Sequence, residues 1–208
     1  MTRKALVGTA LAVLTLGVVL AGCSGGHDMT SMSSSPSAAP AGQAGAHNQA
    51  DIAFAQGMIP HHSQALDMAK LVADRTTNAK VTDLAGRIQK AQDPEIQLMT
   101  GWLTTWGAAS AGMPGMTNGA SMPGMDGTGA PMTGMMTADD MAKLKAAKGA
   151  EFDTMWLQMM TQHHEGAIEM AKTELTQGNS TDAKSLAQKI IDGQQAEITE
   201  MKGLLGQS

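Results

Sequence analysis

The chain has 208 residues, a formal net charge of −5 and one cysteine, which excludes an internal disulfide framework and a multi-cysteine zinc site. The acidic balance provides no clustered basic surface, so no nucleic-acid partner is expected. Aromatic residues make up only 2% of the chain whereas methionine occurs 19 times, and this excess of thioether side chains requires an explanation.

The first 22 residues have the pattern of an export signal. Arg3 and Lys4 precede an apolar stretch over residues 5–20, which is too short for a stable membrane-spanning helix and is typical of a signal peptide. The tetrapeptide LAGC at residues 20–23 resembles the lipobox of bacterial lipoproteins. That resemblance implies that Cys23 is lipidated and anchors the protein outside a bacterial membrane, and an ordinary secretory signal is the alternative.

Residues 23–47 are expected to form a flexible tether. They consist mainly of Ser, Gly, Ala and Pro, which bury too little apolar surface to order a segment. His27, Met29 and Met32 lie in this tether, where we expect them to be spacer residues, with an accessory metal contact as the alternative.

The remaining chain contains an internal repeat. Residues 51–106 align without a gap with residues 153–208, and 18 of the 56 aligned positions are identical, which indicates a duplication. In the first copy, apolar residues recur every three or four positions over 54–72 and again over 81–103, which predicts two helices. No stretch alternates as a strand would.

This pattern predicts an all-α fold, an antiparallel four-helix bundle built from two repeated hairpins over about 48–106 and 138–206. Asn48 is placed to cap the first helix. Thr137 is placed to cap a short extra helix over about 138–148 that ends at Gly149.

A Met-rich insert, residues 107–137, separates the two hairpins. It is too long for a bundle loop and is built from Gly, Ala, Ser, Pro and Met, so we expect it to be disordered. A linker needs no methionine, and thioether sulfur is a soft ligand suited to Cu(I) and Ag(I). The candidate ligands in the insert are Met113, Met116, Met122, Met125, Met132 and Met135, and Met136 is its seventh methionine.

Each repeat also carries two adjacent histidines, one helical turn after a methionine. Imidazole accepts copper in either oxidation state. These candidate metal ligands of the bundle are Met58, His61, His62, Met160, His163 and His164. Four other methionines lie on apolar helical stripes and are expected to pack in the core: Met68, Met99, Met170 and Met201.

Two polar residues interrupt the apolar stripe on the second helix of each repeat. Burying an amide and a carboxylate costs several kcal/mol unless they are partnered, and the nearest partners are the histidines of the neighbouring helix. The carboxylates would then bind the metal directly or orient the imidazoles, and a purely structural His–Glu network is the alternative. These residues are Gln92, Glu95, Gln194 and Glu197.

The strings FAQGMIPHHSQALDMAKLV and FDTMWLQMMTQHHEGAIEMAKTEL, with Gln-x-x-Glu-Ile-x-x-Met in both halves, resemble the domain-of-unknown-function 305 (DUF305) family. The resemblance covers about residues 48–206. It implies an exported protein with a ferritin-like helical bundle and, in some members, copper binding and resistance. It supports the methionine and two histidines of each repeat as candidate ligands, whereas the insert goes beyond the family pattern.

These features together predict a lipid-anchored, extracytoplasmic protein that binds Cu(I), and silver as Ag(I), in metal sequestration, transfer or resistance. Its partners would be the membrane, through the lipid, and a copper donor or acceptor protein. One alternative is a metal-free envelope interaction module. The other is a ferritin-like metal oxidase, but no Glu-x-x-His motif occurs and only Glu95 and Glu197 are carboxylates within the apolar stripes. No enzymatic activity is therefore expected.

Overall fold

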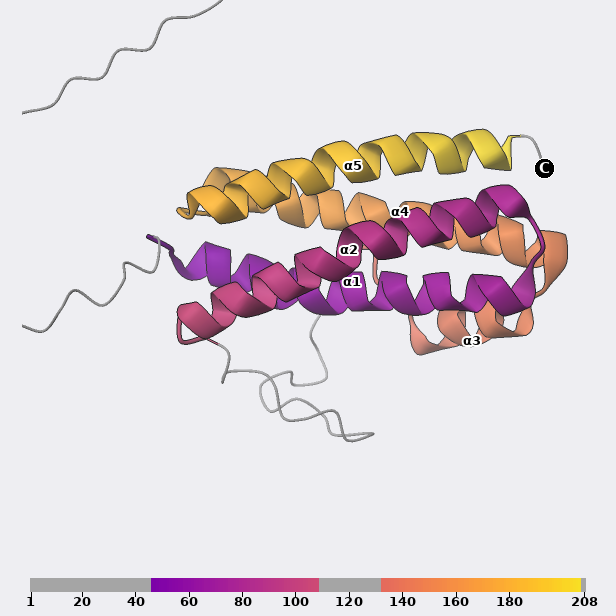
Figure 1. Ribbon diagram of the computed structural model, residues 1–208, viewed down its shortest axis with the longest axis horizontal. Helices are drawn as coiled ribbons and strands as arrows, with labels where there is room; N and C mark the ends of the chain where they lie inside the picture. The colour runs from indigo at the N-terminus through magenta and orange to yellow at the C-terminus, as the bar shows by residue number, and fades with distance from the viewer. Residues whose placement is uncertain (1–45, 109–131, 207–208) are drawn as a thin grey trace, which may run out of the picture. The chain divides into compact units, whose positions relative to one another are not determined.

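The structure, a computed structural model, describes residues 46–108 and 132–206, and every regular element in these residues is an α-helix (Figure 1). They belong to one unit of the chain, Pro40–Ser208. The expected signal peptide with Cys23, most of the expected tether, and four candidate ligands of the insert lie outside the described residues. Those four ligands are Met113, Met116, Met122 and Met125.

Four long helices form two antiparallel hairpins, which confirms the predicted all-α bundle. α1 pairs with α2 and α4 pairs with α5, while α1 and α4 pack against each other and join the hairpins. The short helix α3 contacts both α1 and α4. The helices are α1 (Gln49–Arg75), α2 (Ala79–Thr105), α3 (Ala138–Ala146), α4 (Gly149–Gln177) and α5 (Thr181–Leu205).

Two helices begin with a capping box, in which the cap side chain and the third residue of the helix satisfy each other's backbone N–H groups. In α1 the two residues are Asn48 and Asp51. In α3 they are Thr137 and Asp140. The sequence signals for these two helix starts are therefore present in the structure as expected.

The end of α3 differs from the expectation. The helix stops at Ala146, and Gly149 begins α4 instead of ending α3. Lys148 is extended, and Gly149 has a φ of 58°, a left-handed conformation that glycine adopts readily. The glycine thus allows the chain to change direction sharply between α3 and α4.

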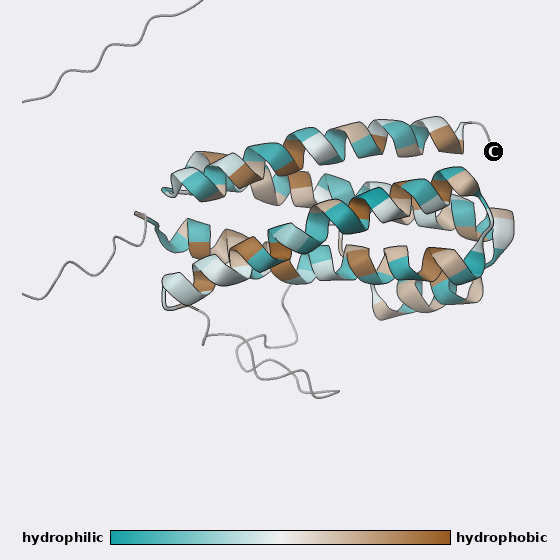
Figure 2. Cartoon of the chain, in the orientation of Figure 1, coloured by the Kyte–Doolittle hydropathy of each residue, from teal (hydrophilic) through white to brown (hydrophobic). Residues whose placement is uncertain are grey.

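The core consists of two apolar clusters. Figure 2 shows hydrophobic and hydrophilic residues following one another along each helix ribbon. The Trp156 cluster includes Trp156 and Met160, and the Phe54 cluster includes Phe54 and Met58. On α1, α2 and α5, one cluster lies before the middle of the helix and the other lies after it. Each large apolar side chain buried this way contributes roughly 1.5–3 kcal/mol.

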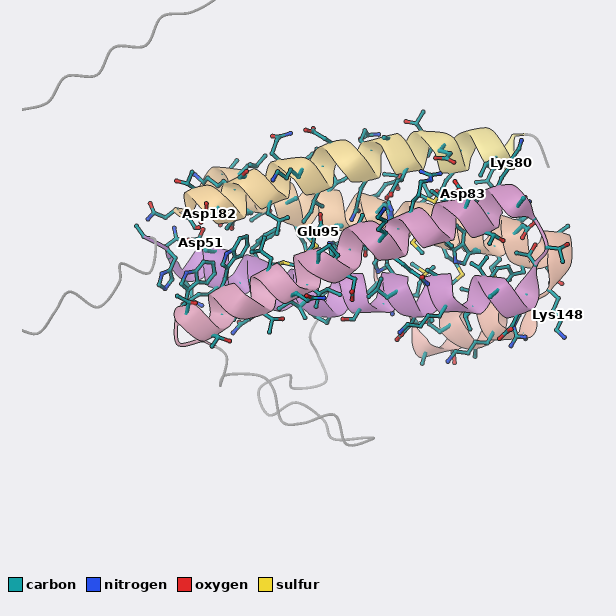
Figure 3. The ribbon with its side chains drawn as sticks, in the orientation of Figure 1. Asp51, Lys80, Asp83, Glu95, Lys148 and Asp182 are labelled. Atoms are coloured by element: carbon teal, nitrogen blue, oxygen red, sulfur yellow. The ribbon has the colours of Figure 1, made fainter. Side chains whose placement is uncertain are left out.

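The two hairpins are joined at both ends of the bundle. Asp51 accepts hydrogen bonds from the backbone N–H groups of Asn179 and Ser180, in the turn between α4 and α5. Its counterpart in the second repeat, Asp153, accepts from the side chain of Asn78, in the turn between α1 and α2. Figure 3 shows Asp51 at one end of the bundle and Glu95 near its middle. These contacts fix the register in which α1 meets α4.

Within the described part of the chain, no helix is both long and apolar enough to span a membrane.

Candidate metal site

A layer of four histidines lies between the two apolar clusters. His61 and His62 come from α1 and His163 and His164 from α4, and all four side chains are fully buried. On α1 the layer separates residues of the Phe54 cluster from residues of the Trp156 cluster. Because the histidine pairs occupy equivalent positions of the two repeats, the antiparallel contact of α1 with α4 brings them together. We call these four residues the histidine layer.

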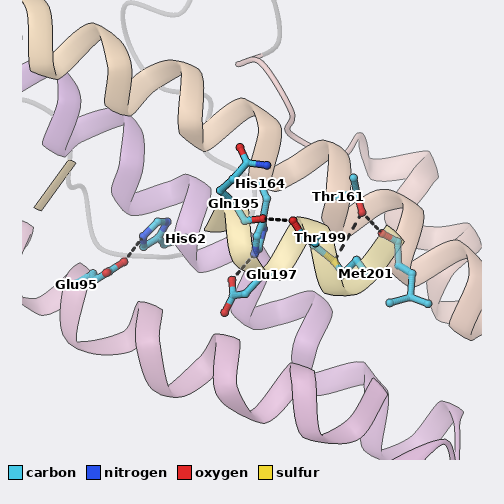
Figure 4. Close-up of polar contacts among 9 residues, drawn as sticks. His62, Glu95, Thr161, His164, Gln195, Glu197, Thr199 and Met201 are labelled. Atoms are coloured by element: carbon cyan, nitrogen blue, oxygen red, sulfur yellow. Dashed lines mark hydrogen bonds and ion pairs between the residues drawn. The ribbon is translucent and has the colours of Figure 1, made fainter. Parts of the chain in front are cut away.

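The outer histidine of each pair is held by a carboxylate from the other helix of its hairpin (Figure 4). His62 Nε2 lies 2.7 Å from Glu95 Oε2, and His164 Nε2 lies 2.7 Å from Glu197 Oε2. An ionised carboxylate only accepts hydrogen bonds, so each imidazole donates through Nε2. In the neutral ring this leaves the lone pair on Nδ1, which is buried without a hydrogen-bond partner.

The inner histidines face each other across the contact between α1 and α4. The ring centroids of His61 and His163 are 3.8 Å apart, with 43° between the ring planes. His61 Nε2 donates to the backbone carbonyl of Thr133 at 3.2 Å, so its Nδ1 also carries a lone pair. Nδ1 of His61 and both ring nitrogens of His163 are buried without a partner among the described residues.

Burial keeps the inner imidazoles neutral. It lowers the pKa of His61 from 6.5 to about 4, against a small opposing effect of the Thr133 carbonyl. It also lowers the pKa of His163 well below 6.5, and the neighbouring histidines add to that effect. Neutral imidazole is the form that binds metal ions, so protons do not compete for these rings near neutral pH.

The two glutamines next to the histidine layer do not bind the histidines, although they were expected to. Gln92 and Gln194 are buried, but neither forms a hydrogen bond with a histidine. Both side-chain polar atoms of Gln92, and Oε1 of Gln194, have no partner in the described chain. The glutamates, one turn further along, form the stronger charge-assisted hydrogen bonds and so occupy the histidine Nε2 atoms.

The candidate thioether ligands of the bundle lie on opposite sides of the histidine layer. Met58 and Met160 are fully buried, Met58 in the Phe54 cluster and Met160 in the Trp156 cluster. Each is one helical turn from the inner histidine of its own helix. Both therefore contribute to core packing and also border the layer.

The end of the Met-rich insert packs over the histidine layer, which differs from the expected disorder. We call residues 132–136 the strap. Besides the contact with His61, the strap forms two hydrogen bonds with Gln64 of α1. The Gln64 side chain donates to the Met136 carbonyl at 2.9 Å and accepts from the Met136 N–H at 2.7 Å. Met136 also packs against the Trp156 cluster, so this thioether belongs partly to the core.

A glycine on α4 makes room for the strap. A Cβ built on Gly166 would lie 2.0 Å from the carbonyl oxygen of Thr133, so only glycine permits this approach. Gly166 and Gln64 are equivalent positions of the two repeats, and one leaves space for the strap while the other binds it. The difference between Gln64 and Gly166 at equivalent positions is the feature of the sequence from which the strap could have been predicted.

The described residues contain no group of three or more His, Cys, Asp or Glu side chains that together could hold a metal ion. In the described chain this holds for the four histidines of the layer as well as for the carboxylates. A soft ion such as Cu(I) accepts imidazole and thioether ligands, so its site does not need three His, Cys, Asp or Glu side chains. An ion in the layer would therefore be held by no more than two of the imidazoles, with thioether sulfur completing its ligands.

The family model for the domain of unknown function (DUF305) matches residues 51–205, which include both hairpins and the histidine layer. The chain belongs to the DUF305 family. The Met…His-His…Met motifs supply the four histidines of the layer. The Gln-x-x-Glu motifs supply the two glutamates that bind His62 and His164.

The solved structures that are similar to this DUF305 chain include two DUF305 proteins and CopM. A secreted DUF305 protein from Streptomyces coelicolor is 35% identical with a TM-score of 0.64, and the match covers 76% of this chain and 93% of that one. A DUF305 fragment from Deinococcus radiodurans is 28% identical with a TM-score of 0.64, covering 77% and 98%. CopM in its Cu(I)-bound form is 27% identical with a TM-score of 0.59, covering 76% and 96%.

CopM is also known in Cu(II)-bound and Ag-bound forms. No curated protein sequence matches the chain.

Proposed function

We propose that this DUF305 protein binds Cu(I), and Ag(I) in its place, through the buried Nδ1 atoms of the histidine layer. The observation that carries the proposal is that the Nδ1 atoms of all four histidines are buried without a partner, while Glu95, Glu197 and Thr133 hold Nε2 of three of them. Metal-binding histidines commonly donate their other N–H to a carboxylate or a carbonyl in this way.

A purely structural histidine network accounts for this arrangement less well. Each buried polar atom without a hydrogen bond costs about 1–3 kcal/mol. A structural network would be stabilised by pairing its ring nitrogens with each other or with Gln92 and Gln194, which it does not do. A metal ion bound to the Nδ1 lone pairs would satisfy them.

Copper and silver are favoured over harder ions by the residues around the layer. Met58 and Met160 border it with soft thioether sulfur, and burial keeps the rings of His61 and His163 neutral by lowering their pKa. The relative CopM has been solved with Cu(I), Cu(II) and silver bound, which supports the same ions for this chain. The proposed role is sequestration, transfer or resistance, and a ferritin-like oxidase is less favoured because no Glu-x-x-His motif occurs in the sequence.

The proposed site of action is outside the cytoplasm. The signal-like first 22 residues support export, as does the relative from Streptomyces coelicolor, which is described as secreted. Lipidation of Cys23 would anchor the protein to a bacterial membrane. The Met-rich insert would then recruit ions for the bundle or exchange them with a donor or acceptor protein.

A Cu(I) titration tests this proposal. Residues 24–208 are titrated anaerobically, under reducing conditions, against a chromophoric chelator that competes for Cu(I). Changing all four histidines of the layer to Ala is expected to remove the tightest site, and deleting residues 109–131 is expected to lower only the stoichiometry. The deletion ends before the strap, because residues 132–136 pack on the bundle and their removal would disturb it.

Helicity measured by circular dichroism provides the control that both variants fold. Equal competition by the parent and the four-histidine variant would contradict binding in the layer. Failure of every protein to compete would overturn the copper proposal as a whole and favour the metal-free interaction module.

A further inference from the structure

Two methionine sulfurs from separate elements meet at one glycine of α1. A Cβ built on Gly57 would lie 3.6 Å from Sδ of Met170, on α4, and 3.9 Å from Sδ of Met132, in the strap. Outside the local helix backbone, these two sulfurs are the only described atoms within 4 Å of that position. Both sulfur atoms therefore lie within 4 Å of the same point beside α1.

The other half of the molecule lacks this arrangement. The repeat counterparts of Gly57 and Met170 are Met159 and Met68, and both pack inside the Trp156 cluster. Met68 is 0% exposed and Met159 is 8% exposed. Met132 and Met170 are instead only partly buried, and Met170, which was expected in the core, packs against the Phe54 cluster. The strap thus brings a sulfur to the position where the first repeat has no side chain.

The sulfur pair lies close to the histidine layer. Gly57 is one helical turn before His61 on α1, a rise of about 6 Å at 1.5 Å per residue. Met132 is adjacent in sequence to Thr133, whose carbonyl accepts the His61 hydrogen bond. The pair therefore borders the side of His61 that the strap covers.

We propose that Met132 and Met170 form a second site for a soft monovalent ion, Cu(I) or Ag(I), through which the ion passes between solvent and the histidine layer. Two thioethers are soft ligands with no proton to lose, and such ions accept few ligands, so the site binds at any pH. Partial exposure makes it accessible while the histidine layer is not. The inference rests on the proposed function, because the ion that leaves this pair enters the layer.

The test is an NMR titration of residues 24–208 labelled with ¹³C at the methionine methyl groups. Silver nitrate supplies Ag(I), which does not undergo redox cycling, and Met132→Leu and Met170→Leu assign the two signals. Both methyl signals are expected to shift together, at the same equivalents of Ag(I). In each single Leu variant, the shift of the remaining methyl is expected to fall.

Gly166→Ala provides a variant that changes neither sulfur. Its Cβ would collide with the Thr133 carbonyl, so the strap and Met132 are expected to move away from Met170, and the joint shift is expected to disappear. The matched control is Met68→Leu with Met159→Leu, the buried counterpart positions, which is expected to preserve the joint shift.

The histidine ring signals, followed in the same samples, separate the two proposals. If the ring signals shift with Ag(I) while the methyl signals of Met132 and Met170 stay unchanged, or shift independently of each other, the second site is overturned and the histidine site stands. If neither the rings nor the two methyl groups respond, both proposals are overturned.

Discussion

Replacing His163 with Leu is expected to stabilise the protein and, at the same time, to weaken Cu(I) binding about 100-fold or more. Both nitrogens of this fully buried ring lack a partner, and a leucine of similar volume removes the cost of burying them, about 1–3 kcal/mol. The same change removes one of the proposed Nδ1 ligands from the histidine layer. Urea unfolding measures the free energy of unfolding, and chelator competition measures the affinity.

The adjacent histidine provides a matched control. His164→Leu removes the partner of Glu197, whose side chain is only 15% exposed, so this variant is expected to lose stability as well as affinity. If His163→Leu destabilises the protein and leaves Cu(I) affinity unchanged, His163 is a structural residue and the account of the layer is wrong.

Changing Glu174 to Gln is expected to remove a loss of stability that occurs as the pH rises from 4.5 to about 8. Glu174 is buried near the end of α4, against the Asp51 carboxylate. Burial first, and then Asp51, raises the pKa of Glu174 from 4.5 to about 8, although Lys184 opposes this rise. Burial alone would also raise the pKa of Asp51, but hydrogen bonds from the backbone of Asn48 and Ser180, from the Glu174 side chain and from the backbone of Asn179 lower it.

The sign of the effect follows from proton binding. Between pH 4.5 and about 8, folded Glu174 holds a proton that the unfolded chain has released, so the free energy of unfolding decreases as pH rises through this window. The decrease is expected to be on the order of a few kcal/mol. Glutamine is neutral at every pH, so Glu174→Gln should flatten that part of the curve.

Thermal or urea unfolding between pH 5 and pH 9 measures the difference between the parent and the Glu174→Gln variant. The control is Glu151→Gln, at an exposed position in the first turn of the same helix, which should leave the pH dependence unchanged. Parallel curves for the parent and Glu174→Gln would show that Glu174 is ionised in the folded protein at all these pH values.

The helices and the buried position of each histidine pair could be predicted because their signals are local and occur twice, whereas the sequence left open whether the two pairs form one shared site or two. The three-to-four periodicity sets the buried face of each helix, and the duplication places each histidine pair on that face in both hairpins. The contacts of Glu95 and Glu197 with His62 and His164 follow from the same register. A chain with one copy of the hairpin would have provided much weaker evidence.

What was missed depends on contacts between segments far apart in the chain. The strap has the composition of a linker, and only the exchange of Gln64 for Gly166 between the repeats indicates that something packs there. Glu174 stands where the first repeat has Val72, so it is a carboxylate on a buried face. From its residue type alone, a glutamate is expected to be exposed to solvent, and only the alignment with Val72 indicates that Glu174 is buried.

The glutamines show a second limit of sequence reasoning. Gln92 and Glu95 are one helical turn apart on α2, so both were expected to reach the histidines. Which of them does so depends on side-chain length, charge and the exact rotation of the helix. Periodicity does not resolve any of these, and the carboxylate is the residue that binds His62.

The central claim is that the histidine layer binds soft metal ions through Nδ1, and its most direct test is ¹⁵N NMR of histidine-labelled protein titrated with Ag(I). The account predicts that Nδ1 signals of the layer shift, while His62 and His164 keep the Nε2–H groups that donate to Glu95 and Glu197. Binding of Ag(I) with every Nδ1 signal unchanged, or with loss of those Nε2–H groups, would contradict it.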